Sequence, residues 1–341
     1  MKSSKQKRLV IVGAGVSGLY LAYLLQEEFH ITILEARERV GGRIFSIKGH
    51  DMGPSWVWPH HTEVLSLIEH LDLQLFRQYT KGYALYDVQG RVERFDTPAS
   101  MPSFRVEGSL STLISALHEK LQDVKLHCNE SVEAIKVQQE CVQVKTTKEV
   151  YESEIVISTL PPRLTAKLHF SPSLEESVLT RLKATQTWMG NSAKCVIEFK
   201  TAFWREKGLS GFTFSHIGPL GEIHDASTTN SAALFGFVNL HADMKNFTQN
   251  VKEQMIRLFD IDEEEIINIY LVDWKREVYT SVQEDAKSLS AHPQYGIDMS
   301  SYSHRVFFSA TEFSYEEGGY IEGAIRQAKK ISKEILIMSR V

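Results

Sequence analysis

The feature that most constrains the fold is a glycine-rich segment near the N-terminus. The apolar residues 9–12 (LVIV) are typical of a strand buried on both faces of a parallel sheet. Residues 13–18 (GAGVSG) follow directly, and a helix-length segment then runs to about Glu28. Residues 31–34 (ITIL) predict a second buried strand. Strand, glycine turn, helix and strand within about thirty residues predict a βαβ unit.

Each glycine of this segment has a mechanical role. Gly13 permits the tight turn out of the strand, and Gly15 lets the backbone approach a pyrophosphate. Gly18 lets the helix pack closely on the sheet, and the N-terminus of that helix offers free N–H groups to phosphates. Glu35 lies 22 residues beyond Gly13, where an acid accepts hydrogen bonds from ribose hydroxyls. The pattern predicts a dinucleotide site and does not distinguish NAD from FAD.

Length and composition narrow the class of protein. The 341 residues predict about two domains, and the 43% hydrophobic and 24% charged content excludes a disordered chain. The 38 basic and 43 acidic residues give a net charge of −5, which argues against a nucleic-acid binder. Three cysteines without a CxxC pair argue against a disulfide framework and fit a reducing cytoplasm. No segment approaches the ~18 apolar residues of a spanning helix, so we expect a cytoplasmic protein without a membrane partner.

The first half of the remaining chain alternates helical and strand patterns. Amphipathic helices are predicted at residues 62–73 and 109–121. A hairpin is predicted to turn at Gln89 and Gly90. Residues 124–157 are rich in β-branched residues and predict several strands.

The second half of the chain first departs from the strand and helix pattern of the N-terminus and then returns to it. Residues 193–199 and 234–240 predict exposed strands of a separate region. Residues 306–308 predict a further buried strand. A final helix is predicted from one apolar stripe, formed by Ile321, Ala324, Ile325, Ala328, Ile331 and Ile335.

Several motifs resemble one known family. Residues 35–43 (EARERVGGR) resemble the extended N-terminal motif of FAD-dependent amine oxidases, and residues 51–56 (DMGPSW) resemble their segment beside the flavin ring. Val132 matches a valine whose backbone meets the adenine. Residues 308–312 (FSATE) resemble the family's FAGTE, and residues 318–324 (GGYIEGA) resemble the start of its last helix. The chain is identified as a short, bacterial-type member of the flavin-containing monoamine and polyamine oxidase family.

The resemblance implies noncovalently bound FAD. Some members carry a cysteine that bonds to the flavin about ten residues after the position of Trp274, whereas this chain has Gln283, Glu284 and Asp285 in that region. The FAD-binding residues implied are Gly13, Gly15, Val16, Ser17, Gly18, Glu35, Ala36, Arg37, Gly42, Arg43, Gly53, Pro54, Ser55, Trp56, Val132, Glu312, Gly319, Tyr320, Ile321 and Ala324.

The resemblance also implies three catalytic residues. Lys194 matches a lysine that holds a water against flavin N5, and Trp274 matches an aromatic residue packed near that water. Tyr320 matches one of two aromatic walls that guide the amine, and the second wall is absent from its usual position. A lysine that merely reaches solvent from a half-exposed strand is the alternative for Lys194. His60 and His61 have no matching ligand spacing, so we expect no metal site.

The implied fold is α/β, with a Rossmann-like FAD-binding domain and a second α+β substrate domain that contains a mixed β-sheet. We assign residues 1–75, 104–165 and 296–341 to the first domain, and 76–103 and 166–295 to the second. The implied activity oxidises the C–N bond of an amine to an imine, which water hydrolyses to a carbonyl product, while dioxygen becomes hydrogen peroxide. The alternatives are a renalase-like or dehydrogenase-type flavoenzyme with a non-amine substrate, and a catalytically idle FAD-binding protein. The oligomeric state stays open.

Overall fold

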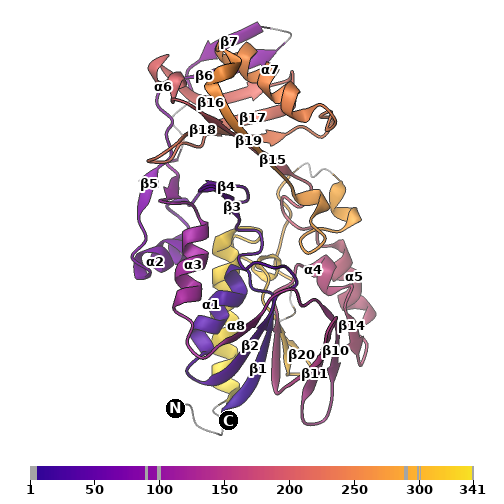
Figure 1. Cartoon of the computed structure of the whole chain (residues 1–341). Helices are drawn as coiled ribbons and strands as arrows, with labels where there is room; N and C mark the ends of the chain where they lie inside the picture. Colours follow the sequence, from indigo (N-terminus) through magenta and orange to yellow (C-terminus); the bar gives the residue numbers. More distant parts are fainter. Residues whose placement is uncertain are drawn as a thin grey trace.

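The computed structural model describes residues 6–88, 91–97, 101–287, 291–297, 299 and 301–339. These residues form two parts that lie one above the other in Figure 1. The lower part is built on a six-stranded sheet and a four-stranded sheet, and the upper part is built on a seven-stranded sheet. The two-part α/β architecture expected from the sequence is confirmed.

The six-stranded sheet of the lower part has the order β20-β21-β13-β1-β2-β9. Neighbouring strands are parallel except for the antiparallel edge pair β20 and β21. The predicted βαβ unit is confirmed as β1, α1 and β2. The strands are β1 (Lys7–Val12), β2 (Phe29–Leu34), β9 (Lys125–His127), β13 (Ile155–Ser158), β20 (Ser301–Tyr302) and β21 (Val306–Phe308).

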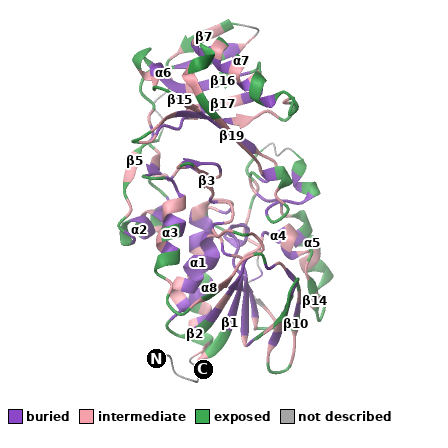
Figure 2. Cartoon of the chain, viewed as in Figure 1, coloured by how far each residue is buried: buried purple, intermediate pink, exposed green. Residues whose placement is uncertain are grey.

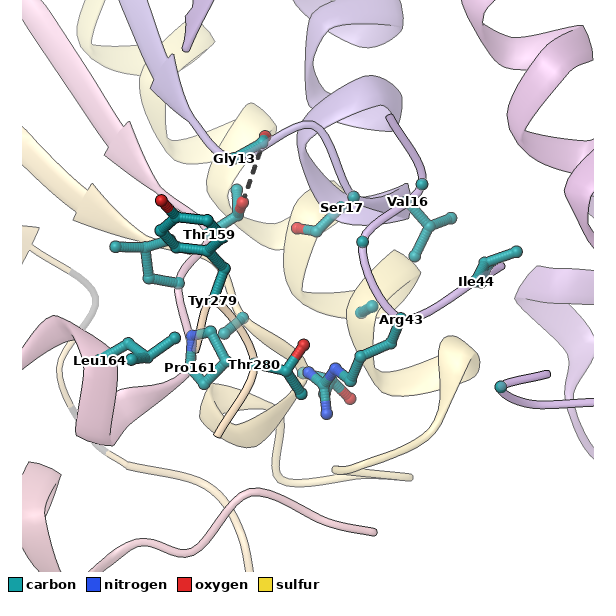
Figure 3. A pocket seen from close by; sticks show the side chains of 18 of the residues that line it. Gly13, Val16, Ser17, Arg43, Ile44, Thr159, Pro161, Leu164, Tyr279 and Thr280 are labelled. Atoms are coloured by element: carbon teal, nitrogen blue, oxygen red, sulfur yellow. Dashed lines mark hydrogen bonds between the residues drawn. The ribbon is translucent and has the colours of Figure 1, made fainter. Parts of the chain in front are cut away.

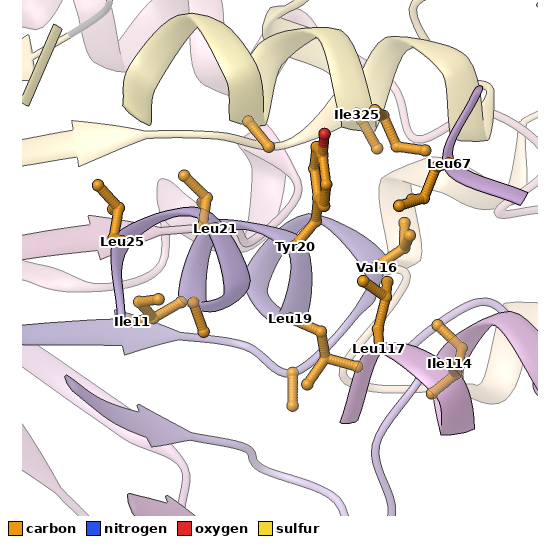
Figure 4. Packing of buried hydrophobic residues seen from close by; sticks show 14 of the residues in the cluster. Ile11, Val16, Leu19, Tyr20, Leu21, Leu25, Leu67, Ile114, Leu117 and Ile325 are labelled. Carbon is orange, nitrogen blue, oxygen red and sulfur yellow. The ribbon is translucent and has the colours of Figure 1, made fainter. Parts of the chain in front are cut away.

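Helices cover one face of this sheet. In Figure 4, α1 lies between the strands and α8, and its side chains fill the space between them. The apolar stripe predicted for the last helix is confirmed, because Ala324, Ile325 and Ile331 are buried in this core. No helix of the described residues is long and apolar enough to cross a bilayer. The helices are α1 (Val16–Leu25), α2 (Thr62–His70), α3 (Ser111–Glu119) and α8 (Ile321–Ser339).

A four-stranded sheet covers the opposite face of the six-stranded sheet. Its order is β12-β11-β10-β14, and Val142 and Val144 are buried together with Val156 and Phe308 of the larger sheet. Both faces of β1 and β13 are therefore shielded, as the purple strands of Figure 2 show. The elements are β10 (Val132–Val137), β11 (Val142–Thr146), β12 (Val150–Ser153), β14 (His169–Ser171), α4 (Pro162–Thr165) and α5 (Glu176–Ala184).

The seven-stranded sheet of the upper part is mixed, as predicted. Its order is β19-β15-β18-β17-β16-β6-β7, and within the described residues only β16 and β6 pair in parallel. The expectation of exposed strands at 193–199 and 234–240 is wrong, because α7 covers one face and buries Cys195 and Leu234. The elements are β6 (Tyr83–Val88), β7 (Arg91–Phe95), β15 (Ala193–Phe199), β16 (Leu209–Ser215), β17 (Leu220–Asp225), β18 (Ala232–Val238), β19 (Ile266–Asp273), α6 (Phe203–Glu206) and α7 (Phe247–Phe259).

Short elements connect the two parts. The strands β6 and β7 pair antiparallel as predicted, and the predicted turn residues Gln89 and Gly90 lie outside the described residues. Two further two-stranded pairs are β3 with β4 and β5 with β8. The elements are β3 (Ser46–Ile47), β4 (His50–Asp51), β5 (Leu75–Arg77), β8 (Phe104–Val106) and the 3₁₀ turns η1 (Glu263–Glu265), η2 (Trp274–Arg276), η3 (Gln283–Ala286) and η4 (Thr311–Phe313).

The domain boundaries stay a prediction. The strand β14, which the sequence places in the substrate domain, pairs with β10 in the lower part. The helix α5 also belongs to the lower part, since Leu182 is buried in the core between the two lower sheets. We propose that the boundary at residue 165 moves to the end of α5.

Gly18 provides a test of how this fold is held. A Cβ atom on Gly18 would lie 2.0 Å from the backbone oxygen of Gly13. Because backbone must move to relieve this clash, we expect Gly18→Ala to lower the free energy of unfolding by about 1–3 kcal/mol. Thermal unfolding followed by circular dichroism measures the change.

Gly15→Ala is the matched control within the same turn. Its Cβ would approach nothing closer than 4.0 Å, and its φ of −72° suits any residue. We expect this variant to unfold near the wild-type temperature. Equal unfolding temperatures for all three proteins would contradict the packing role of Gly18.

Candidate active site

A cavity of about 1210 Å³ opens between the two parts of the chain. The lower part contributes the turn after β1, the end of β2, residues 52–58 and the start of α8, and the upper part contributes β15, β17 and β18. Figure 3 shows one end of the cavity, where Gly13, Ser17, Arg43 and Thr280 surround an open space. A molecule in this cavity would contact segments from the whole length of the chain.

The structure brings most of the predicted site residues together. All of the predicted residues line the cavity except Gly18 and Glu312. Gly18 lies against Gly13 beneath the turn. Glu312 is fully buried, and its carboxylate is 2.9 Å from the guanidinium of Arg43, which does line the cavity. Glu312 therefore holds Arg43, a residue of the cavity wall, and does not line the cavity itself.

The cavity end near β1 has the form of a phosphate site. The helix α1 begins beside Gly15 without a side-chain cap, and Val16 and Ser17 line the cavity. Uncapped N–H groups at a helix N-terminus attract anions, and the helix dipole adds to this attraction. Gly42 has a φ of +58° and passes so close that its Cβ would meet Gly15 at 3.3 Å. The cradle is thus made of backbone, which suits a pyrophosphate.

Glu35 anchors this end of the cavity. One carboxylate oxygen accepts a hydrogen bond from the Ala14 N–H at 2.8 Å, and the other accepts one from the Arg37 N–H at 2.9 Å. Arg37 reaches across to Glu277 at 2.9 Å and to the Thr280 hydroxyl at 2.7 Å. Each carboxylate oxygen has a second lone pair, which leaves Glu35 able to accept ribose hydroxyls. These residues fit the FAD expected from the sequence.

Lys194 occupies the opposite end of the cavity. It lies on β15, is 3% exposed, and donates hydrogen bonds to the Gly53 carbonyl at 2.9 Å and to the Ser55 hydroxyl at 2.5 Å. Its Nζ atom lies 4.1 Å from the centre of the Phe235 ring. The alternative, a lysine that merely reaches solvent from a half-exposed strand, does not describe this buried environment. Burial lowers the pKa of Lys194 from its ordinary 10.5 to about 7, while the charge of Asp51 acts in the opposite direction.

Two further ionisable groups are buried near Lys194. Asp51 accepts a hydrogen bond from the Leu110 N–H at 2.8 Å, and its other oxygen has no partner among the described residues. Burial raises the pKa of Asp51 to about 6, against the positive charges of Lys194 and Arg105. Arg105 donates to the carbonyl oxygens of Ser227 and Ala226 at 2.8 and 3.2 Å. The lysine thus belongs to a small buried charge cluster.

Aromatic rings surround Tyr320. Trp58 lies 5.9 Å away between ring centres, and Trp188 lies 6.4 Å away and lines the cavity. The His292 ring stacks on Tyr320 at 5.2 Å with an angle of 4°. Neither Trp188 nor His292 was predicted, because the sequence prediction placed the second wall only about ten residues after Trp274, at residues 283–285. A tryptophan six residues before Lys194 was the available signal.

The residues after Trp274 have another role. Trp274 lines the cavity and donates from its ring nitrogen to the Met52 carbonyl at 2.9 Å. Asp285 is buried, lies 2.6 Å from Arg163 and accepts from the Thr187 N–H at 3.0 Å. Asp285 is not among the described residues that line the cavity. Asp285 therefore fixes the chain near Trp188, whereas Gln283 and Glu284 are exposed.

Comparisons with known proteins find similarity over nearly the whole chain. A profile of the family described as flavin containing amine oxidoreductase matches residues 16–104 and 99–336. Flavin-containing amine oxidase B from Sus scrofa is 24% identical over 96% of this chain and 86% of its own length, and the A form from Bos taurus is 22% identical over 96% and 84%.

Solved structures share the fold. A putrescine oxidase bound to putrescine superposes with a TM-score of 0.82 at 20% identity, covering 97% of this chain and 99% of that chain. Cyclohexylamine oxidase from Brevibacterium oxydans superposes with a TM-score of 0.81 at 16% identity, covering 98% and 100%.

Glu35 provides a test of the dinucleotide end. Glu35→Ala removes an acceptor for ribose and the anchor of the Ala14 N–H. A hydrogen bond to a charged group contributes about 1.5 to 3 kcal/mol, so we expect the Kd of FAD to rise roughly ten- to one-hundred-fold. Titration of apoprotein with FAD, followed by flavin fluorescence, measures it. Glu27→Ala, an exposed acid, is the control, and an unchanged Kd in Glu35→Ala would exclude the assignment.

Proposed function

Because the chain belongs to the family of flavin-containing amine oxidoreductases, we propose that it oxidises an amine at the C–N bond with dioxygen as acceptor. For a primary amine, one amine, one dioxygen and one water become one aldehyde or ketone, one ammonia and one hydrogen peroxide. Bound FAD supplies the two-electron chemistry, in which the flavin accepts a hydride equivalent from the carbon that bears the nitrogen. The residues of this chain bind, orient and desolvate the reactants.

The observation that carries the proposal is the position of Lys194. An ammonium has three donors, and the Gly53 carbonyl and the Ser55 hydroxyl take two of them. No other hydrogen-bond acceptor of the described residues takes the third donor, which would hold a water molecule in the cavity. Residues 51–56 resemble the family's segment beside the flavin ring, and residues 53–55 line the cavity. This water would therefore lie on the side of the cavity where the flavin ring is expected. We assign to Lys194 the positioning of that water.

The proposed substrate is an amine with an apolar or aromatic substituent. Near Lys194 the cavity is lined by aromatic rings, which bury apolar groups and attract a positive nitrogen to their faces. One acidic residue, Glu222, also lines the cavity, and its carboxylate oxygen lies 2.7 Å from the Nε2 atom of His224. The rings concerned are Trp56, Trp188, Phe235, Phe237 and Tyr320. Anaerobic bleaching of the flavin by a panel of monoamines, diamines, polyamines and amino acids tests this choice.

We propose that FAD is held without a covalent bond. Cys195 lies on β15 next to Lys194 and is buried in the core under α7, because neighbouring strand residues point to opposite faces. None of the three cysteines is among the described residues that line the cavity.

Acid precipitation tests the noncovalent state. Denaturation destroys the cavity, so we expect the flavin to appear in the supernatant with the spectrum of free FAD. A yellow pellet after repeated washing would show a covalent link and contradict the proposal.

Lys194→Met tests the catalytic assignment. Methionine keeps much of the apolar volume and removes the charged group, so folding and FAD content should survive. We expect flavin reduction by amine, or reoxidation by dioxygen, to slow about tenfold or more, which corresponds to at least ~1.4 kcal/mol in the barrier. Stopped-flow absorbance at the flavin band measures the two half-reactions separately.

Lys200→Met is the matched control for this experiment. Lys200 follows the same strand but is exposed, so its replacement removes a charge without touching the cavity. We expect this variant to match wild type in both half-reactions. If Lys194→Met stayed yellow and also matched wild type, Lys194 would have no role at the flavin.

A further inference from the structure

Three metal-ligating side chains meet at the rim of the cavity. His60 and His61 end the loop before α2, and Glu317 lies in the segment before α8. The His61 Nε2 atom is 3.4 Å from one oxygen of Glu317, and the His60 Nε2 atom is 3.7 Å from the other. The three donor atoms all lie within 4.8 Å of one another.

We propose that His60, His61 and Glu317 bind a divalent transition metal ion of the zinc class. Zn²⁺ takes histidine nitrogen and carboxylate oxygen at about 2.0–2.2 Å in a tetrahedron, whose edges are then about 3.4 Å. The two nitrogen-to-oxygen distances in the cluster are close to that edge. Small side-chain rotations would bring all three donors to one ion. Two imidazoles and one carboxylate leave a fourth position for water or another ligand.

The burial of His61 supports the proposal independently. Its side chain is 3% exposed, and its Nε2 atom has no hydrogen-bond partner within the part of the chain that the structure describes. An unpartnered buried polar atom costs free energy, and a metal ion at this position would remove that cost. A carboxylate oxygen of Glu317 lies 3.4 Å from this atom, so an ion between them would contact both donors.

A metal ion at this site would lie beside two aromatic rings of the cavity, those of Trp58 and Tyr320. The His61 ring lies 5.1 Å from Trp58 and 5.8 Å from Tyr320 between ring centres. Glu317 is three residues before Tyr320 and has a left-handed φ of +52°. An ion held by both segments would fix the loop before α2 to the start of α8. The sequence predicted no metal at His60 and His61 because no ligand lies at a matching spacing near them. Glu317 is distant in sequence and approaches the two histidines only in the folded chain.

Zinc binding to the FAD-loaded protein tests the proposal. Protein without a polyhistidine tag is dialysed against a chelator, the chelator is removed, and Zn²⁺ is titrated by calorimetry. Bound metal is then counted by elemental analysis after gel filtration. We expect one zinc per chain, and at least a tenfold weaker affinity in His60→Ala and in Glu317→Gln. His118→Ala, on the exposed side of α3, is the matched control and should bind as wild type does.

Thermal unfolding gives a second measurement that does not depend on activity. Zn²⁺ that binds only the folded chain raises its unfolding temperature, and we expect this rise in wild type and in His118→Ala but not in His60→Ala. His60 is largely exposed, so its replacement should leave the fold intact. No bound zinc in wild type, or equal zinc affinity in wild type, His60→Ala and Glu317→Gln, would overturn the proposal.

Discussion

The contact between Lys194 and the Gly53 carbonyl joins the two parts of the chain at the wall of the cavity between them. It bridges β15 of the upper sheet to a segment that continues from β4 in the lower part. The same segment receives the Trp274 ring nitrogen at the Met52 carbonyl. Gly53 itself fits so closely that a Cβ would lie 2.0 Å from the Arg43 carbonyl. These contacts leave little freedom at residues 52–53, so the cavity floor is fixed by both parts at once.

The opposite end of the cavity, at the turn after β1, is formed by residues that are close together in the sequence. The turn after β1 is held by Gly13 with its φ of +102°, by the packing of Gly18 and by the Glu35 carboxylate on the Ala14 N–H. All of these residues come from one βαβ unit, so backbone geometry alone places the uncapped N–H groups of α1 toward the cavity. A cofactor bound along the cavity would extend from this local cradle to a junction assembled over long distances.

This difference explains what could be predicted from sequence. The glycine turn, Glu35 and the bounds of the strand at residues 193–199 follow from local patterns, and the structure reproduces the elements. The burial of that strand was predicted wrongly because α7, far along the chain, covers it. Trp188 and the ion pair of Asp285 with Arg163 depend on the same kind of long-range contact. Periodicity records which face is apolar, and it does not record which element covers that face.

The buried charges near Lys194 are difficult to explain by stability alone. Burying ionised groups is costly, and apolar residues of similar size often serve a core as well or better. Asp51 even keeps one oxygen unpartnered among the described residues. Perturbed pKa values of this kind cluster at functional sites. Burial lowers the pKa of Lys194 and raises that of Asp51, so the site disfavours the charged form of both groups. The arrangement that weakens the core thus places a buried amine, held by the Gly53 carbonyl and the Ser55 hydroxyl, at the wall of the cavity.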